Sequence, residues 1–130
     1  MALEPFDLLK IVYITASENP PVLVFLVFAG SFILAALNAI YFHYRHQRDL
    51  DQLVMKEQYI DGGLLFNLMR LMLYGHYCLF PKGAQRDGVY EIFSTLPCSI
   101  RVHLIFHWCV VIFSLFLMPL SYLLSNRLDF

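Results

Sequence analysis

The sequence predicts an all-α membrane protein with two transmembrane helices and additional interfacial or amphipathic helices. Composition is the first observation behind this prediction: 59% of the 130 residues are hydrophobic and 15% are charged, whereas a soluble domain carries about 25% charged residues. The second observation is that residues 19–44 and 102–126 contain no Asp, Glu, Lys or Arg. Each segment is longer than the roughly 20 apolar residues that cross a bilayer.

Nucleic acid is an unexpected partner for this chain. The formal net charge is −1, and nucleic-acid binding requires a basic surface. Membrane lipids are the partners that the composition predicts. The three cysteines show no CxxC pair and no regular spacing, which argues against a disulfide framework.

The first transmembrane helix is predicted within residues 20–44. Pro20 and Pro21 suit its first turn, because the backbone N–H that proline lacks would have no partner inside the helix there. The preceding segment has no cationic cluster, and the apolar run is too long for the core of a signal peptide. We therefore expect a permanent span.

Residues 1–19 are predicted to form an interfacial helix that lies on the membrane surface. Its side chains divide at helical spacing into a charged side and an apolar side. The charged side holds Glu4, Asp7 and Lys10, and the apolar side holds Ala2, Phe6, Leu9 and Tyr13.

Residues 45–102 are predicted to form a helical loop in the cytoplasm. Its first part, residues 45–60, is polar and is expected to extend the first span as one rod. The Asp61-Gly62-Gly63 sequence is expected to end this helix, because glycine readily adopts the conformations that terminate helices. Asp61 is expected to cap the next helix with its carboxylate.

An apolar interfacial helix is predicted at residues 64–80 of this loop. Asn67, Arg70 and Tyr74 give it one narrow polar stripe at helical spacing. A central arginine is costly at the middle of a bilayer, so this segment is not expected to be a third span. We expect it to lie on the inner membrane surface or to be buried against a partner.

The second transmembrane helix is predicted at residues 103–124, followed by a tail at 125–130. Seven of the nine Lys and Arg residues lie between the two spans, and each terminal segment has one. Loops rich in Lys and Arg remain on the cytoplasmic side. The loop is therefore predicted inside and both termini outside.

Histidines near the ends of the spans raise the possibility of a bound cofactor. His103 and His107 share one face of the second span, and His43 ends the first span on the same side of the membrane. Imidazoles from facing helices ligate haem iron or transition metals. Histidines are also common at membrane interfaces without a ligand, and no metal-binding motif supports them here. We predict no cofactor or metal and retain the three histidines as candidates.

A helix-contact face is predicted on the first span. Ser31, Ala35 and Ala39 recur every four residues, with Asn38 beside them. Small residues let helix backbones approach closely, and an amide forms hydrogen bonds across such contacts. Three partners are possible: the second span, a second copy of the chain, or another membrane protein.

The end of the first span carries a further pattern. Asn38 precedes a Tyr41-Phe42 pair, Arg48 and Leu50 follow, and residues 59–63 read Tyr-Ile-Asp-Gly-Gly. This run resembles the universal stress protein B family of small two-span bacterial inner-membrane proteins. The chain differs in its N-terminal segment, 1–19, and in the apolar sequence before the second span.

The resemblance implies a location in the cell inner membrane and a role in the stress response. It implies no biochemical activity and no functional residues. We expect a non-enzymatic accessory protein that acts through helix packing with a membrane partner or with itself. The alternative is a small haem- or metal-binding membrane subunit that uses the clustered histidines.

Overall fold

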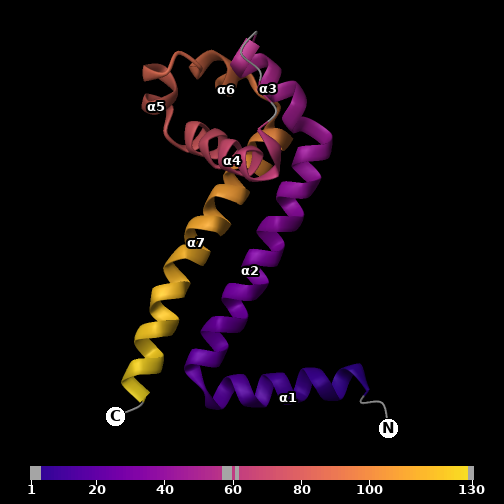
Figure 1. Cartoon of the computed structure of the whole chain (residues 1–130), viewed down its shortest axis with the longest axis vertical. Coiled ribbons are helices and arrows are strands. Elements are labelled where there is room, and N and C mark those ends of the chain that lie inside the picture. The colour runs from indigo at the N-terminus through magenta and orange to yellow at the C-terminus, as the bar shows by residue number, and fades with distance from the viewer. Residues whose placement is uncertain (1–3, 57–59, 61, 129–130) are drawn as a thin grey trace.

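The computed structural model describes residues 4–56, 60 and 62–128. Every regular element in these ranges is a helix, as the sequence predicts. In chain order they are α1 (Pro5–Glu18), α2 (Pro20–Phe42), the π-helix η1 (His43–Gln47), α3 (Arg48–Met55), α4 (Gly63–Leu79), α5 (Pro81–Arg86), α6 (Tyr90–Thr95) and α7 (Cys98–Leu128). Figure 1 shows a long two-helix stem with a head of short helices at one end and α1 at the other.

Helices α2 and α7 run side by side in opposite directions and form the stem (Figure 1). Two continuous helical stretches, Pro20–Met55 and Cys98–Arg127, are long and apolar enough to cross a membrane. The second begins before the predicted start at residue 103, because the carbonyl of Pro97 accepts hydrogen bonds from the backbone N–H groups of Ile100 and Arg101. The last turns of α7 lie at the foot of the stem, where α1 joins α2 (Figure 1).

The rod that begins with α2 continues into the head as far as Met55, whereas the sequence predicts a helix over residues 45–60. The π-helix η1 joins α2 to α3 without ending the rod. Such wider turns are rare and occur mostly inside α-helices, frequently at functional sites. The rod ends at Lys56, which has a φ of 51°. Residues other than glycine rarely adopt this backbone conformation. Asp61, with its expected capping role, lies outside the described residues.

Helices α4, α5 and α6 complete the head above the stem. Its core contains Leu50 from α3, Leu71 and Tyr74 from α4, Phe93 from α6 and Leu104 from α7. Helix α5 begins at Pro81, with one residue between it and the end of α4. Pro81 is compatible with its first turn, since proline's fixed φ is already helical.

Gly75 brings α4 into close contact with α7. A Cβ atom at this position would lie 2.6 Å from the carbonyl oxygen of Leu104 and 2.8 Å from the Cβ of Trp108. Real Cβ atoms do not approach other atoms this closely, so only glycine fits the crossing. The contact sets α4 directly against the head end of the second span.

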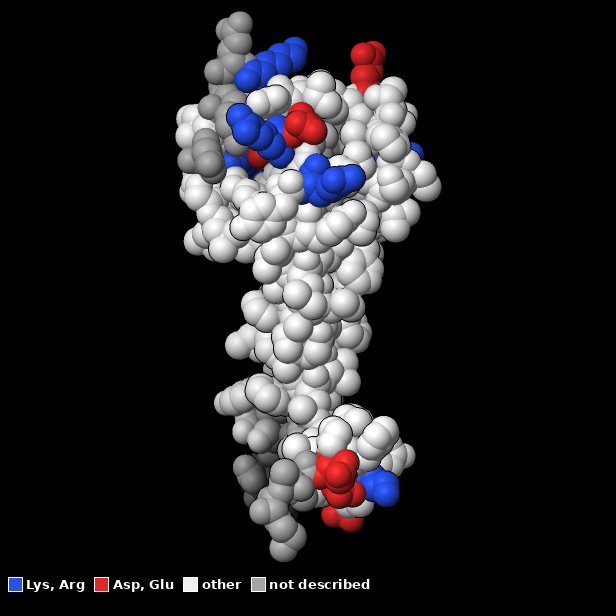
Figure 2. All heavy atoms as spheres, turned by 90° about the vertical axis from the view of Figure 1, so that its right-hand side faces the viewer, with Lys and Arg blue, Asp and Glu red and all other residues white. Residues whose placement is uncertain are grey.

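Charged side chains gather at the two ends of the molecule. On the face shown in Figure 2 they lie on the head and around α1, and the surface of the stem between them has none. Helix α1 leaves the foot of the stem to one side (Figure 1), and its Phe6, Leu9 and Tyr13 are exposed. This arrangement suits a stem within the membrane and helices at both of its surfaces.

Candidate functional site

The four residues of the predicted helix-contact face lie against α7 of the same chain. Ala35 and Ala39 are buried at this interface, and the Ser31 hydroxyl lies 2.8 Å from the Ser114 hydroxyl. The small side chains let the two backbones approach, and the hydroxyl pair adds a polar contact that lipid cannot offer. Of the three partners left open by the sequence, the structure shows the second span.

Asn38 forms two hydrogen bonds with His103 across the same interface. Its Nδ2 donates to the backbone carbonyl of His103 at 3.2 Å, and its Oδ1 lies 2.8 Å from His103 Nδ1. Both ends of the amide are therefore used. The Nδ1–H of His103 is the donor in the second bond, since the amide oxygen only accepts.

The three candidate histidines have separate environments. His43 Nδ1 lies 3.0 Å from Gln47 Oε1 one turn along the rod, and His103 contacts Asn38. His107 is buried further down α7. Within residues 4–56, 60 and 62–128, no three His, Cys, Asp or Glu side chains form a group that could hold a metal ion. The geometry therefore adds no support to the haem or metal alternative.

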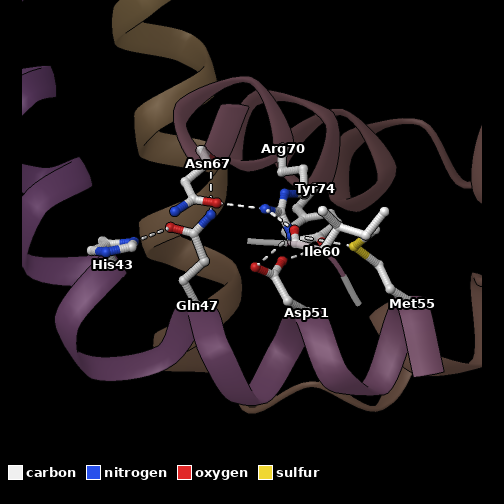
Figure 3. Close-up of polar contacts among 8 residues, drawn as sticks. All are labelled: His43, Gln47, Asp51, Met55, Ile60, Asn67, Arg70 and Tyr74. Atoms are coloured by element: carbon white, nitrogen blue, oxygen red, sulfur yellow. Dashed lines mark hydrogen bonds and ion pairs between the residues drawn. The ribbon is translucent and has the colours of Figure 1, made fainter. Parts of the chain in front are cut away.

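The most connected polar cluster lies inside the head, around Arg70 of α4 (Figure 3). One guanidinium nitrogen, Nη1, donates to Asp51 Oδ2 at 3.0 Å. The other, Nη2, donates to the backbone carbonyl of Ile60 at 3.0 Å and to Asn67 Oδ1 at 2.5 Å. The side chains of Arg70 and Asp51 are 8% and 2% exposed. A buried pair of this kind is stable only when further hydrogen bonds satisfy both charges.

Tyr74 supplies such a hydrogen bond to the carboxylate. Its hydroxyl donates to Asp51 Oδ1 at 2.5 Å, so both carboxylate oxygens accept from α4. Burial of the phenol has the largest effect on the pKa of Tyr74 and raises it. The hydrogen bond to Asp51 raises this pKa further. The tyrosine thus remains a donor throughout the ordinary pH range.

Gln47 connects this cluster to the top of the stem (Figure 3). Its Nε2 donates to the backbone carbonyl of Asn67 at 2.8 Å, and its Oε1 meets His43. Gln47 belongs to η1 and Asp51 to α3, four residues further along the same rod. The last residue of the π-helix is therefore part of the face that the rod presents to α4.

The polar stripe of α4 lies against this chain's own rod, where Asn67, Arg70 and Tyr74 are all buried. The position of this helix at the inner membrane surface or against a partner stays a prediction. The apolar side faces outward instead, with Leu65 and Met69 exposed by 73% and 65%. Asp51 accounts for this orientation, because it offers Arg70 an internal partner of opposite charge.

A second polar contact ties the far end of α4 to the loop after α5. The Tyr77 hydroxyl donates to Asp87 Oδ2 at 2.7 Å, and Arg86 Nε donates to Asp87 Oδ1 at 3.0 Å. Burial and the hydrogen bond to Asp87 raise the pKa of Tyr77 to about 12. The hydrogen bonds from Arg86 and Tyr77 lower the pKa of Asp87.

Several residues of the head were not singled out in the sequence. Gln47, Asp51 and Met55 follow one another at four-residue intervals, which places them on one face of the rod. The matching stripe on α4 was recognised, but its complement on the rod was not. Gly75 carried no signal, because a single glycine in an apolar helix does not reveal which helix crosses it.

Comparison of the chain with models of protein families, with curated proteins and with solved structures finds no match.

Proposed function

We propose that the chain is a small multi-pass protein of the cell inner membrane with a non-enzymatic, accessory role in the stress response. It acts through helix packing with a membrane-protein partner or with a second copy of itself. The resemblance of residues 37–66 to the universal stress protein B family supports the location and the physiological role. The two apolar helical stretches of the stem support insertion in the membrane.

One observation carries the proposal: the inner face of α2 packs against α7, whereas the outer face of α2 is apolar and exposed. Ser31, Ala35, Asn38 and Ala39 contact α7. The outer side of α2 presents exposed Ile33, Leu34 and Leu37, with Gly30 among them. A Cβ at Gly30 would meet nothing within 4 Å among the described residues. A partner helix could therefore approach the backbone of α2 closely at Gly30 without disturbing the packing of α2 against α7.

The head supports a structural role for its ionisable groups. Asp51, Arg70 and Tyr74 bind one another and are withdrawn from solvent. Arg70 and Tyr74 both donate hydrogen bonds to Asp51, and these bonds stabilise the fold. The head is thereby held in one shape above the stem, which suits presentation of a surface to a partner.

Substitution of Gly30 by Leu tests the proposal. The added side chain points away from α7, so we expect the variant to fold normally and to hold a partner helix at a distance. Recovery of a chemically cross-linked neighbour from membranes should fall about tenfold, the ratio for a loss of about 1.4 kcal/mol in association. Cys109→Leu is the matched control, because Cys109 is exposed on α7.

Two results would contradict this account of the outer face. One is equal recovery of cross-linked neighbours from the native chain and from Gly30→Leu. The other is that the native chain yields none at all in membranes. Ala35→Ile serves as a second comparison, since it disturbs the internal α2–α7 contact and should lower folded yield as well as partner recovery.

A further inference from the structure

A pocket in the head is lined by residues from the end of α4, from α6 and from the first turn of α7. Cys78 belongs to α4, Tyr90 and Ser94 belong to α6, and Arg101 belongs to α7. The volume of the pocket is about 310 Å³, at the lower limit of pockets that hold small molecules. Among the described residues that line it, Arg101 is the only charged one.

The positive charge of Arg101 has no carboxylate partner among the described residues, because both ion pairs there are formed by other arginines. The polar group beside Arg101 is the Cys78 thiol. Burial raises the pKa of this thiol, although the Arg101 charge lowers it in part. The thiol is therefore neutral near pH 7 and does not neutralise the arginine.

The end of the Arg101 side chain is the part that a ligand can reach. Its Nε is enclosed by protein and has no hydrogen-bond partner among the described residues, so Nε is not a docking atom. The terminal nitrogens, Nη1 and Nη2, are not enclosed in this way, and the side chain lines the pocket. Partial burial of a cation without an anion is unfavourable. An anion in the pocket that accepts hydrogen bonds from Nη1 and Nη2 would remove this cost.

A phosphate group matches the donors of this pocket. The guanidinium of Arg101 offers two parallel N–H donors, the geometry that binds phosphate. The hydroxyl groups of Tyr90 and Ser94 offer further donors from α6. The oxygens of a tetrahedral phosphate point in several directions, so they accept from two helices at once, whereas a planar carboxylate uses the guanidinium alone. No described Asp or Glu lines the pocket to repel an anion.

Arg101 comes directly before the uncharged run of the second span, residues 102–126. With the stem in a bilayer, the pocket lies near the polar surface on the side of the head, where the phosphate groups of phospholipids are found. We propose that this pocket binds a phosphate group, carried by an anionic phospholipid or by a soluble phosphate ester, through Arg101, Tyr90 and Ser94. The proposal does not rest on the partner at Gly30, because no described residue of α2 lines the pocket.

The test uses the full chain in a neutral maltoside detergent, with bound lipid counted by native mass spectrometry. Dioleoylphosphatidylglycerol is the probe, and dioleoylglycerol, which has the same chains without the phosphate, is the control lipid. We expect the native chain to retain only the first. Arg101→Gln should retain about tenfold less of it, the ratio for loss of one charge-assisted hydrogen bond. Arg45→Gln removes the same charge from an exposed position at the head end of the first span and should retain the lipid like the native chain.

A second pair of variants leaves Arg101 in place. Ser94→Phe fills the pocket and should abolish retention of phosphatidylglycerol. Thr95→Phe adds the same ring at the next position of α6, which is exposed and outside the pocket lining, and should retain the lipid like the native chain.

Glycerol phosphate, added in excess, distinguishes the two sources of the phosphate group. If it binds the native chain and displaces the lipid, the ligand is a soluble ester; if the lipid stays bound, the ligand is a phospholipid. The proposal is overturned if the native chain retains both lipids equally, or if Arg101→Gln retains phosphatidylglycerol as the native chain does. It is also overturned if the native chain binds neither phosphatidylglycerol nor glycerol phosphate.

Discussion

Arg70 on α4 and Asp51 on α3 form an ion pair with a nitrogen–oxygen distance of 3.0 Å, buried inside the head. The two residues are 19 positions apart, on two different helices of the head (Figure 1). Their contact fixes α4 across the rod. It also accounts for an arginine in the middle of an apolar helix.

Replacing Arg70 with Met should destabilise the head by about 3–5 kcal/mol, because it leaves the Asp51 charge buried without its partner. Thermal unfolding of the detergent-solubilised chain, followed by near-UV circular dichroism, measures the change. The double variant Arg70→Met with Asp51→Leu should regain part of the loss, since it removes both charges. Arg86→Met, which breaks the exposed Arg86–Asp87 pair, is the control and should melt like the native chain. Native-like melting of Arg70→Met would show that the ion pair does not hold the head.

Alkaline pH should loosen the far end of α4. The pKa of Tyr77 is raised from 10.0 to about 12 in the folded chain, so the folded state binds the phenolic proton more tightly than the unfolded state. This contribution to stability is complete below pH 10 and is lost as the pH rises toward 12. The ultraviolet absorbance of tyrosinate should show a late-titrating group that is missing in Tyr77→Phe. If the group that Tyr77→Phe removes titrates near the ordinary tyrosine value of 10.0 instead, the contact with Asp87 is excluded.

Adding a methyl group at Gly75 should push α4 away from α7. The new Cβ would lie 2.6 Å from the Leu104 carbonyl oxygen, and overpacking of this kind costs about 1–3 kcal/mol. Gly83→Ala is the matched control, because its Cβ would lie 3.6 Å from His76 Nε2, an ordinary contact. We expect a lower melting temperature than that of the native chain for Gly75→Ala, and an unchanged melting temperature for the control. If both variants melt alike, α4 does not cross α7 at this point.

Seven basic residues in the connecting loop, against one in each terminal segment, predict that the head is cytoplasmic and both termini lie outside. A cysteine introduced at Lys82 should react with an impermeant maleimide only from the cytoplasmic side, and one at Lys10 only from outside. The native cysteines are replaced by alanine for this experiment. Labelling with the opposite sidedness would reverse the orientation and exclude a cytoplasmic head.

The helical fold and its two apolar stretches were predictable because both depend on local composition. An uncharged run of about 25 residues has few alternatives to a helix of membrane length. The rod beyond the first span and the helix at 64–80 were also predictable, since polar and apolar residues recur there at helical spacing. None of these features requires knowledge of what the helix touches.

The internal partner of Arg70 could not be predicted, because it depends on how the chain folds back on itself. Asp51 and Arg70 each fit an exposed position equally well in the sequence alone. The same limit applies to His107, whose burial on α7 depends on the helices that pack around it.

Ser31 and its neighbours contact α7 of the same chain, which leaves the outer face of α2 exposed. Cysteines at Ser31 and Ser114 test it most directly, because the two hydroxyl oxygens lie 2.8 Å apart. Oxidation in membranes of a chain without its native cysteines should give a disulfide within one chain, with monomeric mobility on a denaturing gel. A cysteine at Phe116, which is 72% exposed, should form no such bond with the one at residue 31. Disulfide-linked dimers between position 31 of one chain and position 114 of another, in place of the monomer, would contradict the account.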